Sequence, residues 1–339
     1  MPSVAQPQGP GVMAQTGPPA PNPPADEKQE LDDLIRALEK ARGSRVLVYW
    51  TAPIARLSDA VVLSLYDQLT AIGKTGKIDL FLNTAGGDTE IPWRIVSLVR
   101  EFCDEFAVLV PHRAASAGTL IAMGADEIVM TPLGVLGPID PSRTHPLLPR
   151  REGAAEAEPI SVQDMRHAMQ FIREAAGSDR EMPYTPEAMA QIFSALFDKI
   201  HPLAIGAIEQ SYALSKLVGT QCLSTHMDAE TDAAKIREIV DQLCDAYKSH
   251  SYQISRAEAR KIGLKAVDAP DDVSDAMMAL FRFYVARPLM PPTQPTPGQQ
   301  FQAHIAWLET TALHFRVEAS CVVDQDGALK FLADQWVAY

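Results

Sequence analysis

Residues 106–119 read Phe-Ala-Val-Leu-Val-Pro-His-Arg-Ala-Ala-Ser-Ala-Gly-Thr, and this stretch decides the fold class. Its first five residues are typical of a buried strand, and residues 120–124, Leu-Ile-Ala-Met-Gly, predict a short buried helix. A hydrolase places its nucleophile at such a strand-to-helix turn, because the turn lifts a serine hydroxyl clear of the sheet. N–H groups at the helix start can face a developing oxyanion. Ser116 is therefore a candidate nucleophile, although small residues at a turn also serve packing alone.

A strand-loop-helix rhythm surrounds this turn and predicts an α/β fold with largely parallel strands and catalytic loops at the strand ends. The expected strands are 45–50, 78–82, 106–110 and 127–130, and the expected helices are 27–42, one capped by Ser58, and 91–102. After Asp140 the pattern becomes mostly helical, with stretches expected at 161–176, 185–199, 203–224 and 228–248. Ser255 to Glu258 match a capping box before a short helix that ends at Gly263.

Two proline-rich segments divide the chain. Residues 1–26 hold almost no large apolar side chain, so we expect a disordered tail. Residues 27–286 are expected to form the main domain, and residues 287–299 a second proline-rich linker. The remaining residues, 300–339, are expected to form a small appendage with a β-hairpin whose turn contains Asp-Gly.

Composition excludes several classes of function. A net charge of −13, with no basic run, argues against a surface for nucleic acid or anionic membrane. The four cysteines are widely spaced, which predicts reduced thiols, a cytoplasmic location and no metal cluster. No apolar run approaches the roughly 20 residues of a membrane span, and the N-terminus lacks the pattern of a secretory signal. No glycine pattern typical of a nucleotide cofactor follows a strand, so no cofactor is expected.

Two glycines follow the preceding strand, in Ala85-Gly86-Gly87-Asp88. Glycines let the backbone approach a ligand closely and turn its N–H groups toward it. A tight turn is the commoner role of a Gly-Gly pair. Beside Ser116, however, an N–H from Gly86 or Gly87 together with that of Ala117 could form an oxyanion site.

These segments resemble a known family. Residues 83–88, 111–122, 125–130 and 136–141 look like the Clp-protease/crotonase fold superfamily, and within it the signal-peptide-peptidase-like branch of serine dehydrogenase proteinases. The resemblance is specific over about 45–141 and looser to about 270. It implies a fold of repeated β-β-α units with a mostly helical C-terminal half, and a homo-oligomer. It also implies Ser116 as the nucleophile, with Gly86, Gly87 and Ala117 as the oxyanion site.

The general base is less well determined. Clp proteases carry a histidine in the segment that here reads Gly137-Pro-Ile-Asp140-Pro, where Asp140 takes its position. The signal-peptide-peptidase branch uses a lysine further along, and Lys199 is the first lysine after Lys77. A lysine accepts the serine proton only if burial lowers its pKa. An ordinary lysine at the end of a helix is an equally good interpretation of Lys199.

Three further residues are possible auxiliaries: His112, His201 and Asp140. Each also has an ordinary structural interpretation, as a hydrogen-bonded histidine, a helix-start residue or a capping carboxylate.

The leading hypothesis is a cytoplasmic serine peptidase that cleaves peptides or proteins through an acyl-enzyme on Ser116, with Lys199 as its base. One alternative is a crotonase-type enzyme acting on an acyl-CoA thioester, with the same glycine geometry and a glutamate acid or base. The other is a catalytically weak oligomeric scaffold of the same fold.

Overall fold

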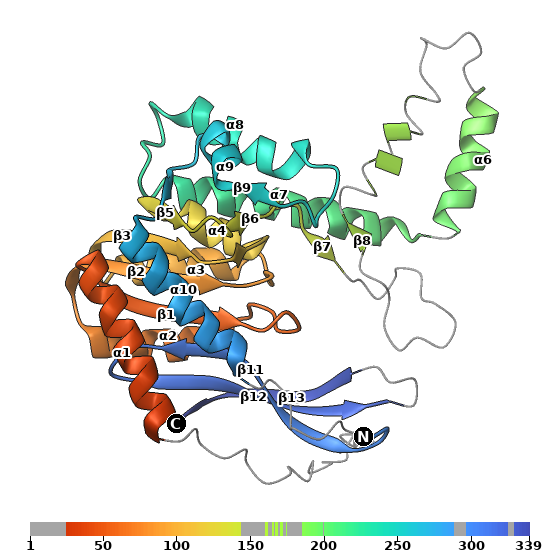
Figure 1. The fold of residues 1–339 in the computed structure, drawn as a ribbon. Coiled ribbons are helices and arrows are strands. Elements are labelled where there is room, and N and C mark those ends of the chain that lie inside the picture. Colours follow the sequence, from red (N-terminus) through yellow and green to blue (C-terminus); the bar gives the residue numbers. More distant parts are fainter. Residues whose placement is uncertain are drawn as a thin grey trace, which may run out of the picture.

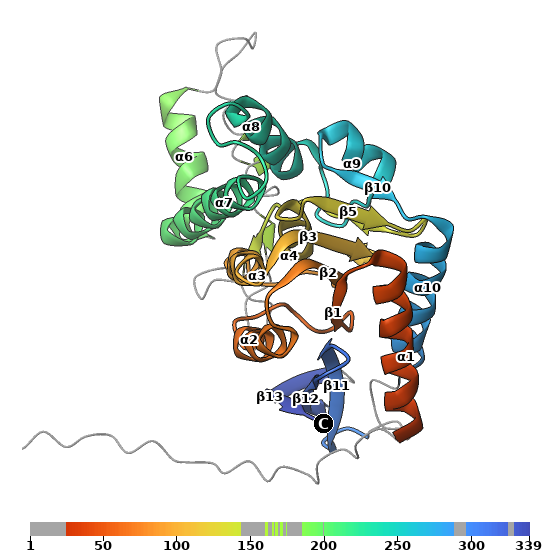
Figure 2. The same cartoon turned by 90° about the vertical axis from the view of Figure 1, so that its left-hand side faces the viewer.

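A single eight-stranded sheet lies at the centre of the structure, a computed structural model (Figures 1 and 2). The structure describes residues 25–143, 160–161, 165, 167–168, 170–171, 174, 185–198, 200–287, 296–324 and 329–339. The strand order is β10-β5-β3-β2-β1-β11-β12-β13. The first five strands of this order run parallel: β10 (Ala266–Asp268), β5 (Glu127–Met130), β3 (Cys103–Val110), β2 (Thr75–Asn83) and β1 (Arg45–Thr51).

Helices cover both faces of the parallel part (Figure 2). On one face lie α1 (Ala25–Arg42) and α10 (Asp271–Ala286), and on the other α2 (Val61–Ile72), α3 (Ile91–Arg100) and α4 (Ala117–Met123). Outside this second layer lie α7 (Pro202–Leu223), α8 (Ala233–Asp241), the π-helical turn η1 (Gln242–Ala246) and α9 (Arg256–Ile262). Each face of the sheet therefore has its own apolar core, which explains why β3 ends in a continuous apolar run, Phe106–Val110. The predicted α/β class is confirmed.

Short strand pairs lie beside the main sheet. β4 (Arg113–Ala114), β6 (Val135–Leu136) and β9 (Ile254–Ser255) form a small three-stranded sheet, and β7 (Ser142–Arg143) pairs with β8 (Ile160–Ser161). The small sheet holds the turn that contains Ser116 against the segment after β5.

The two helix-start predictions have different outcomes. Ser58 is not the N-cap of α2, because the helix begins at Val61 after Ala60, with no side-chain cap; only the Ser58 carbonyl accepts from the Val61 N–H, at 3.3 Å. Ser255 is confirmed as the cap of α9, since its hydroxyl accepts from the Glu258 N–H at 3.3 Å. Helix α9 ends at Gly263, whose φ of +105° favours glycine.

The C-terminal strands continue the main sheet. β11 (Gln300–Glu309) pairs antiparallel with β1, and β12 (His314–Val323) and β13 (Leu329–Ala338) follow it as an antiparallel hairpin. The hairpin matches the expectation from sequence, whereas α10 and β11 were not expected. The predicted domain boundaries remain a prediction, and residues 1–24 and 288–295 lie outside the described residues.

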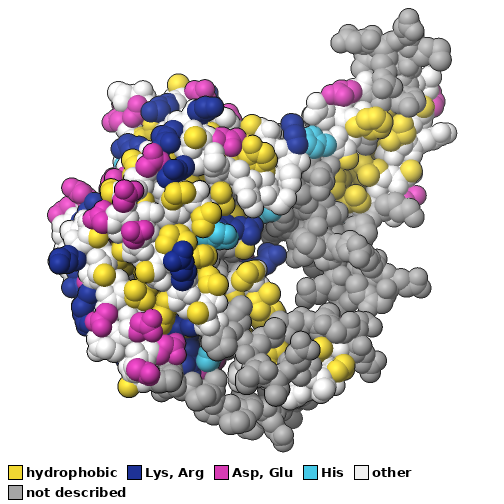
Figure 3. Space-filling model, in the orientation of Figure 1, with side chains coloured by type: hydrophobic (Ala, Val, Ile, Leu, Met, Phe, Trp, Pro, Cys, Tyr) yellow, Lys and Arg dark blue, Asp and Glu magenta, His cyan; other side chains and the backbone are white. Residues whose placement is uncertain are grey.

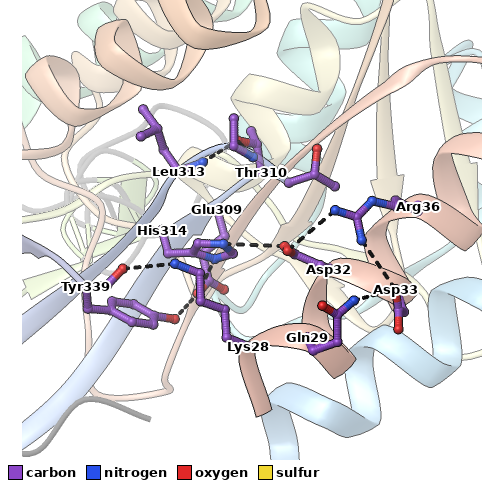
Figure 4. Close-up of polar contacts among 12 residues, drawn as sticks. Lys28, Gln29, Asp32, Asp33, Arg36, Glu309, Thr310, Leu313, His314 and Tyr339 are labelled. Carbon is purple, nitrogen blue, oxygen red and sulfur yellow. Dashed lines mark hydrogen bonds and ion pairs between the residues drawn. The ribbon is translucent and has the colours of Figure 1, made fainter. Parts of the chain in front are cut away.

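A buried polar cluster ties the C-terminal strands to α10 and to α1, and Figure 4 shows its contacts with α1. Glu309, at the end of β11, is fully buried and accepts hydrogen bonds from the hydroxyls of Tyr284 and Tyr339. The Arg287 guanidinium lies 3.4 Å from its carboxylate, and His314 Nδ1 lies 3.6 Å away. We call these five residues the Glu309 cluster. His314 Nε2 also lies 3.4 Å from Asp32 of α1, so the cluster joins three elements far apart in sequence.

Helix α6 (Pro186–Phe197) stands away from the sheet (Figure 1). Figure 3 shows hydrophobic side chains on this outlying part, and no residue of α6 is buried against the described part of the chain. Among the described residues, no helix combines the length and apolar character needed to cross a bilayer.

Candidate active site

The backbone at Ser116 is strained. The chain leaves β3 at Val110, passes through β4 and enters α4 directly after Ser116. Ser116 has φ +52° and ψ −113°, and it is the only non-glycine residue with positive φ in the described part of the chain. Such a conformation costs about 1–3 kcal/mol and persists only where surrounding contacts impose it. The half-buried serine thus has the sharp turn that the sequence predicts for a nucleophile.

Gly86 lies directly against Ser116. A Cβ at Gly86 would lie 2.8 Å from the Ser116 Cβ and 2.9 Å from the Ala115 carbonyl oxygen, closer than such atoms approach. Its φ of +106° also favours glycine. The two turns are joined by backbone hydrogen bonds, since the Thr84 N–H donates to the Arg113 carbonyl at 2.8 Å and the Ala115 N–H to the Thr84 carbonyl at 3.1 Å. The predicted glycine turn and the predicted serine turn therefore meet.

The three predicted oxyanion donors differ in how their N–H groups are used. The Gly86 N–H donates to the Thr84 hydroxyl at 3.1 Å. Among the described residues, no acceptor takes the N–H of Gly87 or of Ala117. Ala117 is the first residue of α4, where an N–H has no partner within the helix. One free donor thus follows Ser116 in the chain, and the other follows Gly86, which contacts Ser116.

The loop 52–60, after β1, holds the glycine turn from the other side. The Leu57 N–H donates to the Gly86 carbonyl at 3.0 Å, and the Asp88 N–H donates to the Leu57 carbonyl at 2.9 Å. A Cβ at Gly87 would lie 2.2 Å from the Leu57 carbonyl oxygen. Both glycines are therefore required by packing, Gly86 against Ser116 and Gly87 against Leu57.

The segment after β6 is fixed beside the serine turn. The Thr119 hydroxyl donates to the Gly137 carbonyl at 2.8 Å, and the Gly137 N–H lies 3.0 Å from the same hydroxyl. A Cβ at Gly137 would lie 3.0 Å from the Ala115 Cβ. These contacts place the segment that contains Asp140 alongside the predicted nucleophile.

A histidine that the sequence did not single out pairs with Asp140. The carboxylate of Asp140 is 1% exposed, and its Oδ1 lies 3.1 Å from Nδ1 of His250. The hydrogen bond with Asp140, opposed by burial, raises the pKa of His250 above its ordinary value. A buried carboxylate on Nδ1 orients an imidazole and fixes its tautomer, as in a catalytic triad. No local pattern marks His250, because it lies in a loop far along the chain.

The other predicted base candidates have separate positions. His112 is exposed and stacks on Phe281, with ring centroids 5.2 Å apart; burial and the charge of Arg113 lower its pKa. His201 caps α7, its Nδ1 accepting from the Leu203 N–H at 3.2 Å. Lys199 lies outside the described residues.

A known protein family matches the part of the chain that contains the Ser116 turn. Residues 27–149 match the family model of the ClpP-like SDH-type serine proteinases. Over this segment, about a third of the chain, the sequence is similar to that family. The SDH-type segment contains the glycine turn and Ser116, and it ends before His201, the cap of α7, and before His250. The predicted ClpP-like fold is confirmed.

Two relatives from Methanocaldococcus jannaschii are themselves uncharacterised. One is 34% identical over 119 residues, covering 32% of this chain and 40% of the relative, and the other is 25% identical over 216 residues, covering 64% and 61%. The chain thus spans less than two thirds of the length of either curated relative.

Solved structures overlap only loosely. A variant of a 1510-N membrane-bound stomatin-specific protease is 17% identical with a TM-score of 0.35, covering 67% of this chain and 81% of that one. The ClpP protease catalytic domain from Plasmodium falciparum is 11% identical with a TM-score of 0.37, covering 74% and 95%. TM-scores this low support no conclusion about this chain.

Proposed function

We propose that this chain is a serine peptidase that hydrolyses peptide bonds of peptide or protein substrates through an acyl-enzyme on Ser116. The observation that carries the proposal is the contact between the strained Ser116 and Gly86, with the unused N–H groups of Gly87 and Ala117 beside it. Backbone strain at a half-buried serine and unpaired N–H donors both cost stability, and a reaction site needs both.

The reaction follows from these groups. The Ser116 oxygen attacks the substrate carbonyl carbon while its proton passes to a general base. The carbonyl oxygen becomes an oxyanion that accepts from the Gly87 and Ala117 N–H groups, and loss of one such donor costs about 10²–10³ in kcat. The base then protonates the leaving amine. Water, activated by the same base, releases the acyl group and restores Ser116.

Lys199 is the base proposed from the sequence, because it is the first lysine after the serine turn and immediately precedes the start of α7. His250 is the competing base, and the observation that favours it is its contact with the buried Asp140. The two proposals differ in pH dependence. Because the pKa of His250 is raised, its neutral, proton-accepting form becomes the major form at a higher pH than in an ordinary histidine.

Covalent labelling tests the nucleophile and the base together. A fluorophosphonate probe is applied to the wild type, Ser116→Ala, Lys199→Met and His250→Gln. Lys248→Met, at an exposed position, serves as the matched control. We expect Ser116→Ala to abolish labelling and one of the two base variants to slow it by at least about 100-fold. Labelling that survives Ser116→Ala overturns the proposal.

Other results of these experiments would support the two alternative functions. Absence of labelling and of peptide cleavage in the wild type indicates the oligomeric scaffold, and bound acyl-CoA in the purified protein indicates the crotonase-type reaction. We further propose a cytoplasmic homo-oligomer. Light scattering that gives the mass of one chain contradicts the oligomer.

A further inference from the structure

A groove lies between the loop 52–60 and the C-terminal strands. Its volume is about 230 Å³ and it opens to solvent. The large side chains along it are those of Tyr49, Ile54, Ile305, Val317, Phe331 and Trp336. Phe331 is 44% exposed, so part of its ring is free to meet a ligand.

The chemistry of the groove favours a neutral apolar occupant. The Tyr49 and Trp336 rings meet edge to face with centroids 6.1 Å apart, and this contact holds both rings in place as part of the groove wall. Arg56 and Asp334 contribute one charge of each sign, so the lining has no net charge that would select an ion. An aromatic or large aliphatic side chain is the ligand that such walls bind.

The loop 52–60 connects this groove to the candidate active site. Its middle residue, Leu57, is hydrogen-bonded to the glycine turn, while Ile54, Arg56 and Ser58 of the same loop line the groove. The glycines that would hold the substrate carbonyl and the apolar groove thus lie on either side of one loop.

The distance between the two sites matches a short length of extended peptide. From the end of β3 across β2 and β1 to β11 there are three steps in the sheet, and at about 4.8 Å a step the separation is about 14 Å. At about 3.3 Å per residue, an extended chain covers this in about four residues. A substrate lying across the strand ends, with its cleaved bond at Ser116, reaches the groove at that spacing.

We propose that this groove is a substrate subsite, which binds an aromatic or large aliphatic side chain about four residues from the cleaved bond. The inference rests on the peptidase function proposed above. Half of the wall comes from β11, β12 and β13, and these strands lie beyond residues 27–149, the segment matched by the family. The C-terminal strands therefore give this chain a sequence preference of its own.

Matched peptides and adjacent variants test the subsite. The peptides have ten or more residues and share one cleavage site. In each peptide, one position three to five residues before or after that site is Phe, Leu, Ser or Asp. They are compared on the wild type, Phe331→Ala, Phe331→Asp and Leu332→Ala. Leu332 is the control, because it is a neighbouring apolar residue, 50% exposed, that does not line the groove. Thermal melts confirm that each variant is folded.

We expect the wild type to prefer Phe or Leu over Asp at one position by roughly tenfold or more in kcat/KM. Phe331→Asp should remove the preference, Phe331→Ala should reduce it, and Leu332→Ala should keep it. Cleavage of a short acyl ester that cannot reach the groove should be unchanged in all three. A preference that survives Phe331→Asp overturns the subsite.

Binding separates failure of the subsite from failure of the peptidase. The same peptides, labelled with a fluorophore, are titrated into Ser116→Ala with and without Phe331→Asp. Weaker binding of the Phe peptide by roughly tenfold supports the subsite, whether or not the wild type cleaves. Equal binding overturns it, even where Ser116→Ala abolishes cleavage. A changed oligomeric state in Phe331→Asp, with unchanged peptide binding, also overturns it and makes the groove a contact between copies.

Discussion

The turn at Ser116 and the Glu309 cluster use buried polar groups in opposite ways. In the cluster, the Glu309 carboxylate accepts from two tyrosine hydroxyls, and the Arg287 guanidinium neutralises it. At the turn, the N–H groups of Gly87 and Ala117 have no acceptor among the described residues, and the Ser116 backbone is strained. A buried carboxylate that accepts hydrogen bonds and faces a cation rigidifies a fold, whereas unused backbone donors are free for a ligand. The comparison predicts that changes in the cluster affect stability and changes at the turn affect activity.

Loss of the Glu309 carboxylate should give the largest effect. Glu309→Ala leaves the Arg287 guanidinium buried without its main partner, and removal of one member of a buried pair costs about 3–5 kcal/mol. Urea unfolding should show this loss, with labelling of Ser116 per folded molecule unchanged. Glu90→Ala, at an exposed glutamate, is the control. A loss below about 1 kcal/mol would show that the cluster is not a stabilising site.

A side chain at Gly86 should have the reverse effect. In Gly86→Ala the new methyl group meets Ser116 and the Ala115 carbonyl at a backbone φ of +106°. The displaced turn should reduce fluorophosphonate labelling by about 10²–10³, the usual effect of a lost oxyanion interaction. Gly76→Ala is the matched control, because no atom lies within 4 Å of a Cβ built there. Full labelling of Gly86→Ala would show that the contact has no part in the reaction.

Acid should weaken the cluster through Glu309. Burial alone would raise the pKa of this carboxyl, but the charge of Arg287 and neighbouring hydrogen bonds lower it below its ordinary value. A lowered folded-state pKa stabilises the protein above the unfolded pKa of about 4.3, and this stability is lost as pH falls through the folded-state value. Unfolding free energy should therefore fall more steeply below about pH 4 in the wild type than in Glu309→Gln. If the unfolding free energies of the two proteins fall in parallel with pH, the acid sensitivity does not come from Glu309.

The smallest expected effect distinguishes between His250 and Lys199 as the general base. Asp140→Asn removes the main cause of the raised His250 pKa, so NMR titration should place that pKa lower than in the wild type. If His250 is the base, the acidic limb of the labelling rate should move to lower pH in the same variant, because the neutral form is then populated earlier. A limb that stays in place while the His250 pKa moves would favour Lys199.

Local sequence patterns predicted the turns at Ser116 and Gly86 better than they predicted the contacts between distant segments. The Ser116 turn, the glycine turn and the parallel strands depend on residues close in sequence, and small residues or apolar runs reveal them. The pairing of Asp140 with His250 depends on contacts between segments far apart, which no local spacing encodes. Ser58 was misjudged as a cap because an N-cap residue type does not fix where the first helical turn begins.

The position of β11 has a consequence for folding. Strand β1 pairs with β2 on one side and β11 on the other, and β11 begins at residue 300, about three quarters of the chain length after β1 ends at residue 51. During synthesis, β1 therefore has an open edge until the C-terminal strands leave the ribosome. Such non-local pairing slows folding and leaves an unpaired strand available to other chains. Nascent chains that end before β11 should thus be the aggregation-prone form of this protein.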